Sequence, residues 1–311
     1  MFDSAPTRPS RPVQVEALAH ITHRLGRAAE APWLHAEAAR RMAERLQLIR
    51  LQPRSLVDWW SFNGATGGLL QQAYPASRVL RVEADDAVMQ RSRSAAATRW
   101  WLPQRWLGPA VTWATPAQVA PGKADLLWAN MMLHLAADPP ALLQQWQRAL
   151  AVNGFLMFST LGPGSLQGLR RIYERLRWPA PHAPFVDMHD LGDMLVRCGF
   201  ADPVMDQETL TLTWPDADAL LLELRGLGGN ADPARAPGLR TPRWRDRLRA
   251  ELQQLQGPDG RLRLDFELVY GHAFLAAPKP RVAAQTTVAL EDMRSMVRSP
   301  RRSAGPSDGL R

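Results

Sequence analysis

The chain has 311 residues, of which 46% are apolar and 22% are charged, and its mean hydropathy is −0.27. This composition is typical of a water-soluble globular protein with one large domain, and it excludes a transmembrane protein because no apolar run approaches the ~20 residues that span a bilayer. The formal charge is +8, from 38 basic and 30 acidic residues. About half of this excess lies in the last tenth of the chain, so the charge does not by itself indicate nucleic-acid binding.

The two ends of the chain differ in composition from its middle. Residues 1–19 begin with a proline-rich stretch that has no apolar run of the signal-peptide kind, which predicts a flexible N-terminus and a cytoplasmic protein. Residues 278–311 are basic and contain Pro, Ser and Gly with little apolar periodicity, which predicts a disordered tail. The single cysteine, Cys198, excludes an internal disulfide.

The first half of the chain alternates between helical and strand patterns. Apolar and alanine positions recur at helical spacing from His20 to Leu51, which predicts one or two amphipathic helices. Predicted strands then follow at 55–58, 78–83, 111–113, 124–129 and 154–159, and helical patterns lie between them within 64–74, from 86 onward and at 139–150. Because parallel neighbours need a crossover connection, this alternation predicts a doubly wound, mostly parallel α/β sheet covered on both faces.

The second half has longer strands and fewer crossovers. Predicted helices cover 165–178, 188–198, 216–226 and 243–256, and predicted strands cover 204–214 and 262–275. Two late strands without an obvious crossover predict an antiparallel edge on the sheet. We therefore expect one seven-stranded domain over 20–277, with helical insertions at 160–190 and 215–258.

The carboxyl ends of the first two strands are the expected place for a ligand, because doubly wound sheets bind ligands at this edge. Glu83 ends the second strand, 25 residues after Asp58. A carboxylate at that position suits the hydroxyl pair of a ribose, although a solvated acid at a strand end is equally ordinary. Nucleotide-type ligands also need glycine in the loop after the first strand, so that the backbone can approach them. Here Trp60 and Phe62 precede the first glycine, Gly64.

Other kinds of site find less support. His182 and His189 are seven residues apart, but no further ligands accompany them, so a metal site is not expected. Ser159 lacks the Gly-x-Ser-x-Gly elbow of a hydrolase. Tryptophans at 100, 101 and 106 lie beside arginines and can stack on bases, but no nucleic-acid recognition fold accompanies them.

Three segments, taken together, resemble a known family. They are Ala124-Asp-Leu-Leu-Trp-Ala-Asn-Met-Met-Leu-His134, the stretch from Leu150 to Arg170 that contains Phe-Ser-Thr-Leu-Gly-Pro-Gly-Ser-Leu, and the stretch from Val186 to Trp214. The first is similar to S-adenosylmethionine (SAM) methyltransferases of class I in general. The other two resemble the malonyl-acyl-carrier-protein O-methyltransferases of biotin synthesis, a subgroup that also includes assembly factors of respiratory complex I. The resemblance covers roughly residues 20–277 and implies a Rossmann-like fold with SAM as cofactor.

The resemblance also implies cofactor-binding residues. Asp58 matches the acid that opens the family's glycine loop, Ser61 lies within that loop, and Gly64 matches its last glycine in an ungapped alignment. Glu83 matches the ribose-binding acid, and Asn130 matches the residue after the fourth strand. In this register Trp60 and Phe62 replace two glycines, whereas a slipped register would use Gly64 and Gly67.

The implied reaction transfers the methyl group of SAM to the free carboxylate of a malonyl thioester carried by acyl carrier protein or coenzyme A. A carboxylate is ionised at neutral pH, so positioning and desolvation replace a general base. The expected substrate-binding residues are Arg170, His134 and Trp33, the last in place of the family's N-terminal tyrosine. Arg170 and the arginines up to Arg177 are alternatively expected to face the acidic carrier protein. Because of the divergent loop, a methyltransferase-like binding or assembly protein with lost or altered cofactor use is the alternative function.

Overall fold

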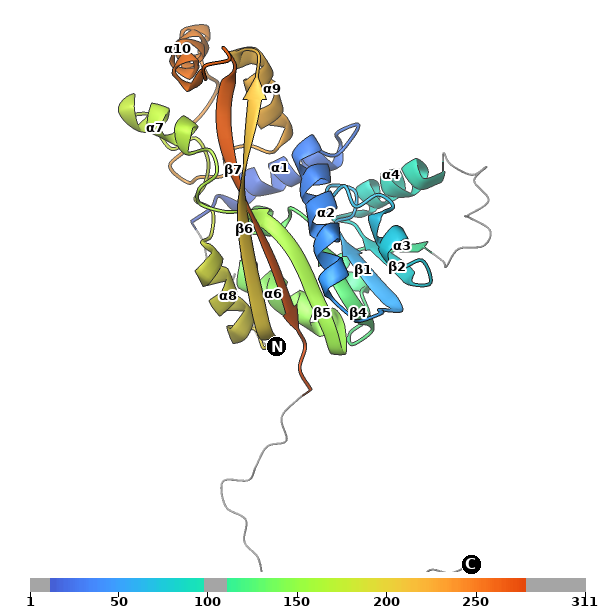
Figure 1. The fold of residues 1–311 in the computed structure, drawn as a ribbon. Helices are drawn as coiled ribbons and strands as arrows, with labels where there is room; N and C mark the ends of the chain where they lie inside the picture. The colour runs from blue at the N-terminus through green and yellow to red at the C-terminus, as the bar shows by residue number, and fades with distance from the viewer. Residues whose placement is uncertain (1–11, 98–110, 278–311) are drawn as a thin grey trace, which may run out of the picture. The chain divides into compact units, whose positions relative to one another are not determined.

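The computed structural model describes residues 12–97 and 111–277, and it forms one seven-stranded sheet in the order β3-β2-β1-β4-β5-β7-β6 (Figure 1). The first five strands are parallel, and β7 runs antiparallel to both β5 and β6. The predicted fold class is therefore confirmed. The bounds are β1 Ser55–Trp59, β2 Arg78–Val82, β3 Val111–Ala114, β4 Ala124–Ala129, β5 Leu150–Leu161, β6 Ala201–Trp214 and β7 Leu262–Phe274. The predicted tail and the tryptophans at 100, 101 and 106 lie outside the described residues.

The helices lie near their predicted positions. They are α1 Val15–Gly26, α2 Trp33–Arg45, α3 Leu69–Ala73, α4 Asp86–Ala97, α6 Pro139–Ala149, α7 Gln167–Arg175, α8 Met188–Arg197, α9 Ala217–Gly226 and α10 Pro242–Leu252, with short 3-10 turns at 46–48, 116–118, 133–135 and 253–255. Side chains cap several of them. Asp216, for example, accepts a hydrogen bond from the Ala219 N–H at 2.8 Å, as expected for an aspartate at the N-cap.

Neighbouring residues of the central strands point into two different cores, as the period of two in a strand requires. Leu56 and Leu126 belong to the larger apolar cluster, which includes α2, α7, α9 and α10. Val57 and Leu127 belong to a second cluster with α6 and α8. Both faces of the parallel strands are thus covered, and polar side chains that act on a ligand are confined to the strand ends.

Helix α1 begins earlier than the predicted domain boundary at residue 20. It starts at Val15, and Ala17 and Leu18 are buried together with Val13 against residues that follow β4. The N-terminal segment therefore contributes to the core from residue 13 onward.

A helical cap surrounds the extended ends of β6 and β7 (Figure 1). It consists of α7, which contacts β7, α9, which contacts β6, and α10, which contacts both of these helices. The helical insertions expected at 160–190 and 215–258 stay a prediction as domain bounds. Leu169 of α7 and Leu224 of α9 line a cavity.

Gly271 of β7 provides a test of the sheet packing. It pairs with Phe158 of β5, whose ring lies directly over it. A Cβ at this position would lie 2.5 Å from Phe158 Cζ and 2.9 Å from Met205 Sδ, and Phe158 is fully buried. We expect Gly271→Ala to lower the free energy of unfolding by about 1–3 kcal/mol, because an overpacked core must distort. Urea denaturation measures this change.

Gly226→Ala is the matched control, since a Cβ there meets no atom within 4 Å. We expect the control to be neutral or slightly stabilising. Equal midpoints for Gly271→Ala and the unsubstituted protein would show that the β5–β7 contact is not tightly packed.

Candidate functional site

The carboxyl ends of β1, β2 and β4 bring together three polar side chains that are distant in sequence. Asp58, Glu83 and Asn130 are each only 1% exposed. β1 lies between β2 and β4 in the sheet, so the three side chains meet at one edge. Ser61 and Gly64 follow β1 in the same loop. The structure therefore assembles all five residues that the sequence assigned to cofactor binding.

In the loop after β1, Trp60 has a backbone conformation that glycine favours although its side chain is large. Trp60 has φ of +53°, a left-handed conformation that glycine adopts readily and a bulky residue rarely does. The Gly64 N–H donates to the Trp60 carbonyl at 2.8 Å. A Cβ at Gly64 would lie 3.2 Å from that oxygen and 3.3 Å from the Asn130 carbonyl oxygen. This close approach to Asn130 supports the ungapped register, in which Gly64 is the last glycine.

The indole of Trp60 packs against two apolar clusters, one below the sheet edge and one around α1. Phe62, the second bulky residue, lies with its ring centroid 5.5 Å from the Arg91 guanidinium. Both residues therefore differ from the family's glycines in side chain, while the chain path at Trp60 is the one that a glycine would take.

Glu83 already has partners within this loop. Its Oε1 accepts from the Ser61 hydroxyl at 2.7 Å and from the Phe62 N–H at 3.1 Å. Burial raises the pKa of Glu83, and the hydrogen bonds from Ser61 and Ser92 oppose this shift. Oε2 also lies 3.4 Å from the Phe62 N–H. A carboxylate offers about four acceptor positions, so its partners Ser61, Phe62 and Ser92 leave capacity for a further hydrogen bond.

Asp58 is the more strongly perturbed acid. It accepts a hydrogen bond from the Thr66 hydroxyl at 2.9 Å. Burial raises its pKa to about 7, while Arg81 and Thr66 act in the opposite direction. A carboxyl group with this pKa is partly protonated near neutral pH, so the stability of the folded protein depends on pH through Asp58.

Asn130 ties the loop to helix α2. Its Nδ2 donates to the carbonyl oxygens of His35 at 2.7 Å and Gly64 at 2.6 Å, and its Oδ1 accepts from the Ser159 hydroxyl at 2.6 Å. His35 is fully buried, and its Nδ1 lies 2.7 Å from the Asn63 carbonyl oxygen. Burial lowers the pKa of His35 to about 4. His35 is therefore neutral, donates from Nδ1 and carries an acceptor at Nε2.

The polar groups of this edge fit a ligand with hydroxyl and charged amino groups. Two buried atoms near Asn130, His35 Nε2 and Asn63 Oδ1, have no hydrogen-bond partner among the described residues. Unsatisfied buried polar atoms are costly, about 1–3 kcal/mol each, and are rare in native proteins. Together with the remaining acceptor capacity of Glu83, these atoms are hydrogen-bonding groups that a ligand can satisfy.

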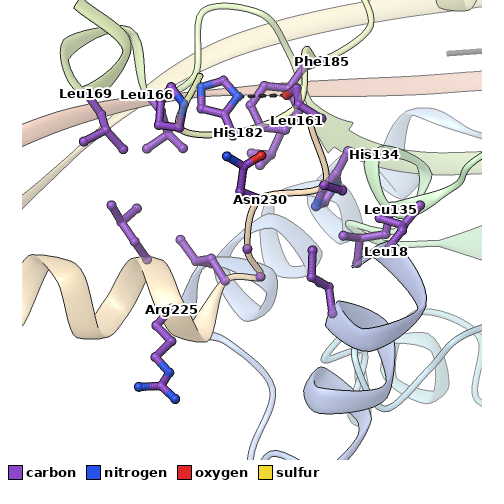
Figure 2. Close-up of a pocket in the computed structure, with 18 of the residues that line it drawn as sticks. Leu18, His134, Leu135, Leu161, Leu166, Leu169, His182, Phe185, Arg225 and Asn230 are labelled. Carbon is purple, nitrogen blue, oxygen red and sulfur yellow. Dashed lines mark hydrogen bonds between the residues drawn. The ribbon is translucent and has the colours of Figure 1, made fainter. Parts of the chain in front are cut away.

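A cavity of about 340 Å³ has His134 in its wall, four residues after Asn130 (Figure 2). None of Asp58, Ser61, Gly64, Glu83 and Asn130 lines it. Its wall is mainly apolar and is built from α1, the segment after β4, the loop after β5, α7, α9 and the loops before and after them. The polar side chains in the wall include His134, His182 and Asn230. Phe185 stacks on His182 at a ring distance of 4.9 Å and meets His134 edge-on at 6.1 Å. Arg225 also lines the cavity, but Figure 2 shows its guanidinium extending away from the other labelled residues.

The three residues predicted to bind substrate lie in different places. His134 lines the cavity, and its ring meets that of His35 edge-on at 6.4 Å. Arg170 is half exposed, pairs with Glu174 at 2.9 Å and is not part of the cavity wall. Trp33 is 55% exposed at the start of α2 and is likewise not part of the wall.

Sequence analysis missed His35 and treated His182 only as a metal candidate. His35 follows Trp33 by two residues in the same helix, but nothing in the local pattern shows that it is buried beside Asn63. Burial lowers the pKa of His182, and its Nε2 has no partner among the described residues. Only the folded chain places these two rings on either side of His134 and Phe185.

Residues 12–97 and 111–277 contain neither a cluster of metal ligands nor a membrane-spanning helix. No group of three His, Cys, Asp or Glu side chains there lies close enough together to bind a metal ion. None of the helices in that part of the chain has the length and apolar character of a membrane span.

Solved structures show the same fold at low sequence identity. The YcgJ protein of Bacillus subtilis aligns with a TM-score of 0.53 at 11% identity, covering 78% of this chain and 99% of that protein. A structure described as a putative methyltransferase of Bacillus halodurans aligns with a TM-score of 0.51 at 10% identity, covering 76% and 99%. At these identities the similarity establishes the fold alone.

Sequence comparison identifies the family. A family model described as a methyltransferase domain matches residues 34–202. The malonyl-acyl-carrier-protein O-methyltransferase of Gallionella capsiferriformans is 37% identical over 252 residues, which is 79% of this chain and 85% of that protein. The enzyme of the same name from Laribacter hongkongensis is also 37% identical, over 80% and 84% of the two chains. The chain therefore belongs to the malonyl-acyl-carrier-protein O-methyltransferase family of SAM-dependent methyltransferases.

Proposed function

We propose that this protein methylates the free carboxylate of a malonyl thioester at the start of biotin synthesis, with SAM as methyl donor and an acyl carrier protein as carrier. The observation that carries the proposal is an apolar cavity with His134 in its wall, whose ring meets the ring of His35, the residue that Asn130 bonds at the carboxyl end of the sheet. Relatives with this named activity support the choice of substrate.

In this proposal the edge binds the cofactor. Glu83 accepts hydrogen bonds from the ribose hydroxyls, which take over from the Ser61 hydroxyl. The amino-acid end meets the polar groups around Asn63, His35 and Asn130. When bound, SAM supplies a methyl group on a positively charged sulfur, which a nucleophile can displace.

The cavity prepares the nucleophile. A malonyl carboxylate has a pKa near 4 and is ionised at neutral pH, so no residue has to remove a proton. The leucine-rich wall excludes water from the carboxylate, and His134, four residues after Asn130, is proposed to contact and orient it. One carboxylate oxygen forms a bond to the methyl carbon, the carbon–sulfur bond breaks, and the products are a methyl ester and a neutral thioether.

Incubation of the purified protein with SAM and malonyl-loaded carrier protein tests this function. We expect the malonyl group to gain one methylene in mass, with one equivalent of S-adenosylhomocysteine formed. Ala183→Phe places a ring in the cavity wall, where Ala183 is 7% exposed, and we expect kcat/KM to fall at least about tenfold. If SAM binds but no malonyl ester forms, the protein has another substrate.

One observation favours the alternative function of a binding or assembly protein without cofactor chemistry. Trp60 and Phe62 occupy glycine positions, and Glu83 is already bound by the loop. In that case the protein binds no SAM even at millimolar concentration. Titration calorimetry of the unsubstituted protein with SAM therefore separates the two functions.

A further inference from the structure

Tyr173 connects the cavity to the surface of the helical cap. It is 8% exposed and lines the cavity from α7. Its ring packs edge-on against Trp178 at 5.3 Å and against Trp244 at 6.3 Å, and the two indoles lie 5.0 Å apart. These contacts fix the end of α7 against the start of α10 (Figure 1). Tyr173 therefore separates the cavity from the two tryptophans and from the surface around them.

Arginines surround this aromatic cluster. Arg177 precedes Trp178 in the chain, Arg243 and Arg245 flank Trp244, and the Arg240 guanidinium stacks on the Trp244 ring at 4.7 Å. All four are exposed. We call these four residues the arginine patch. Three of them are chain neighbours of Trp178 or Trp244, and the fourth stacks on Trp244. Because the two indoles are in contact, the backbones of the four arginines lie close together on the cap.

The charges of the patch are not balanced within the protein. Other arginines of the cap form ion pairs: Arg170 pairs with Glu174, Arg175 and Arg247 pair with Glu251, and Arg249 pairs with Asp218 and Asp246. None of the four patch residues forms an ion pair with a described residue. The positive charges of the patch are therefore available to bind an acidic partner.

We propose that the arginine patch is the docking surface for the acidic carrier protein that delivers the malonyl thioester. The inference rests on the proposed function and adds to it the part of the surface that recognises the carrier. Opposite charges steer and orient such an encounter. When the carrier protein binds the patch, the flexible arm that holds the malonyl thioester lies next to Tyr173, at the wall of the cavity. Of the arginines from Arg170 to Arg177 that the sequence offers for the carrier protein, the patch contains Arg177, whereas Arg170 pairs with Glu174.

A double charge reversal tests this surface. Arg243→Glu with Arg245→Glu breaks no ion pair among the described residues, so folding is expected to be retained. The matched control, Arg148→Glu with Arg197→Glu, makes the same change in net charge on the exposed faces of α6 and α8. Each variant is assayed with the malonyl-loaded carrier protein and with malonyl-pantetheine, which has the same thioester and arm but no protein.

We expect the patch variant to raise KM for the carrier-bound substrate by about 10–100-fold, which corresponds to ~1.4–2.8 kcal/mol. KM for malonyl-pantetheine and kcat for both substrates should stay within about twofold. The control variant should behave like the unsubstituted protein. An unchanged KM for the carrier-bound substrate, or an equal rise for both substrates, would overturn the proposed docking surface.

Direct binding separates this inference from the proposed function. If the unsubstituted protein methylates neither substrate, the proposed function fails, and the affinity for malonyl-loaded carrier protein, measured by fluorescence anisotropy at several salt concentrations, still tests the patch. Binding that weakens with salt and with the patch variant, but not with the control, supports the docking surface. No binding, or equal binding by all three proteins, refutes it.

Discussion

Replacing Glu83 with alanine is expected to abolish SAM binding. In the proposed complex this carboxylate accepts hydrogen bonds from both ribose hydroxyls, and hydrogen bonds to a charged group contribute about 1.5–3 kcal/mol each. Loss of both weakens binding by at least about 100-fold. The unsubstituted protein should show a rise in melting temperature with millimolar SAM and a measurable heat of binding by calorimetry. Glu83→Ala should show neither.

Two further variants make the result specific. Glu83→Gln retains the shape and one acceptor but not the charge, so we expect intermediate affinity. Glu174→Ala removes an exposed acid of α7 and should bind SAM like the unsubstituted protein. Glu83→Ala also leaves the Ser61 hydroxyl and the Phe62 N–H without their acceptor, so its folding has to be checked by circular dichroism. Equal SAM affinity for a folded Glu83→Ala would remove Glu83 from the cofactor site.

Replacing Asp58 with asparagine is expected to change how stability depends on pH. Burial raises the pKa of Asp58 to about 7 in the folded protein, whereas an unfolded aspartate titrates near 3.9. Between these values the folded state binds a proton that the unfolded state has released, so this group makes the protein less stable as pH rises from about 4 to 7. Three pH units correspond to up to about 4 kcal/mol.

The asparagine variant lacks this penalty. Relative to the unsubstituted protein, we expect Asp58→Asn to be about equally stable near pH 4 and more stable at pH 7.5, by up to about 4 kcal/mol. Urea denaturation of the cofactor-free proteins at pH 4.5, 6 and 7.5 measures the difference. Asp193→Asn, on the exposed face of α8, is the control. A difference for Asp58→Asn that stays constant across this range would show that the buried carboxyl group titrates normally.

His35 has the opposite dependence and provides an internal check. Burial lowers its pKa to about 4, against about 6.5 when unfolded. Between these values the unfolded state binds the extra proton, so this group makes the protein more stable as pH rises from about 4 to 6.5. His35→Gln should therefore lose stability relative to the unsubstituted protein as pH rises through this window.

The sequence alone determined the family and the fold class, and it predicted the edge of the sheet at which a ligand binds. The family rests on the resemblance of the segments 124–134, 150–170 and 186–214 to known enzymes. The fold class rests on the alternation of strands and helices, and the predicted site on Glu83 at the end of one strand and Asn130 after another. Such patterns reflect backbone geometry, in which the periods of strands and helices set which residues are buried. The contact of Gly64 with Asn130 also agrees with the ungapped alignment.

Only the tertiary structure decided what surrounds those residues. The loop sequence does not show that Trp60 adopts a left-handed conformation with its indole packed away, nor that Ser61 bonds Glu83, because both depend on β2, α1 and the core. The cavity wall combines segments from Val13 to Phe266. Whether an arginine is paired or available likewise depends on which acids the fold brings near it, as the difference between Arg170 and Arg245 shows. Long-range packing determines these contacts, and no local pattern encodes it.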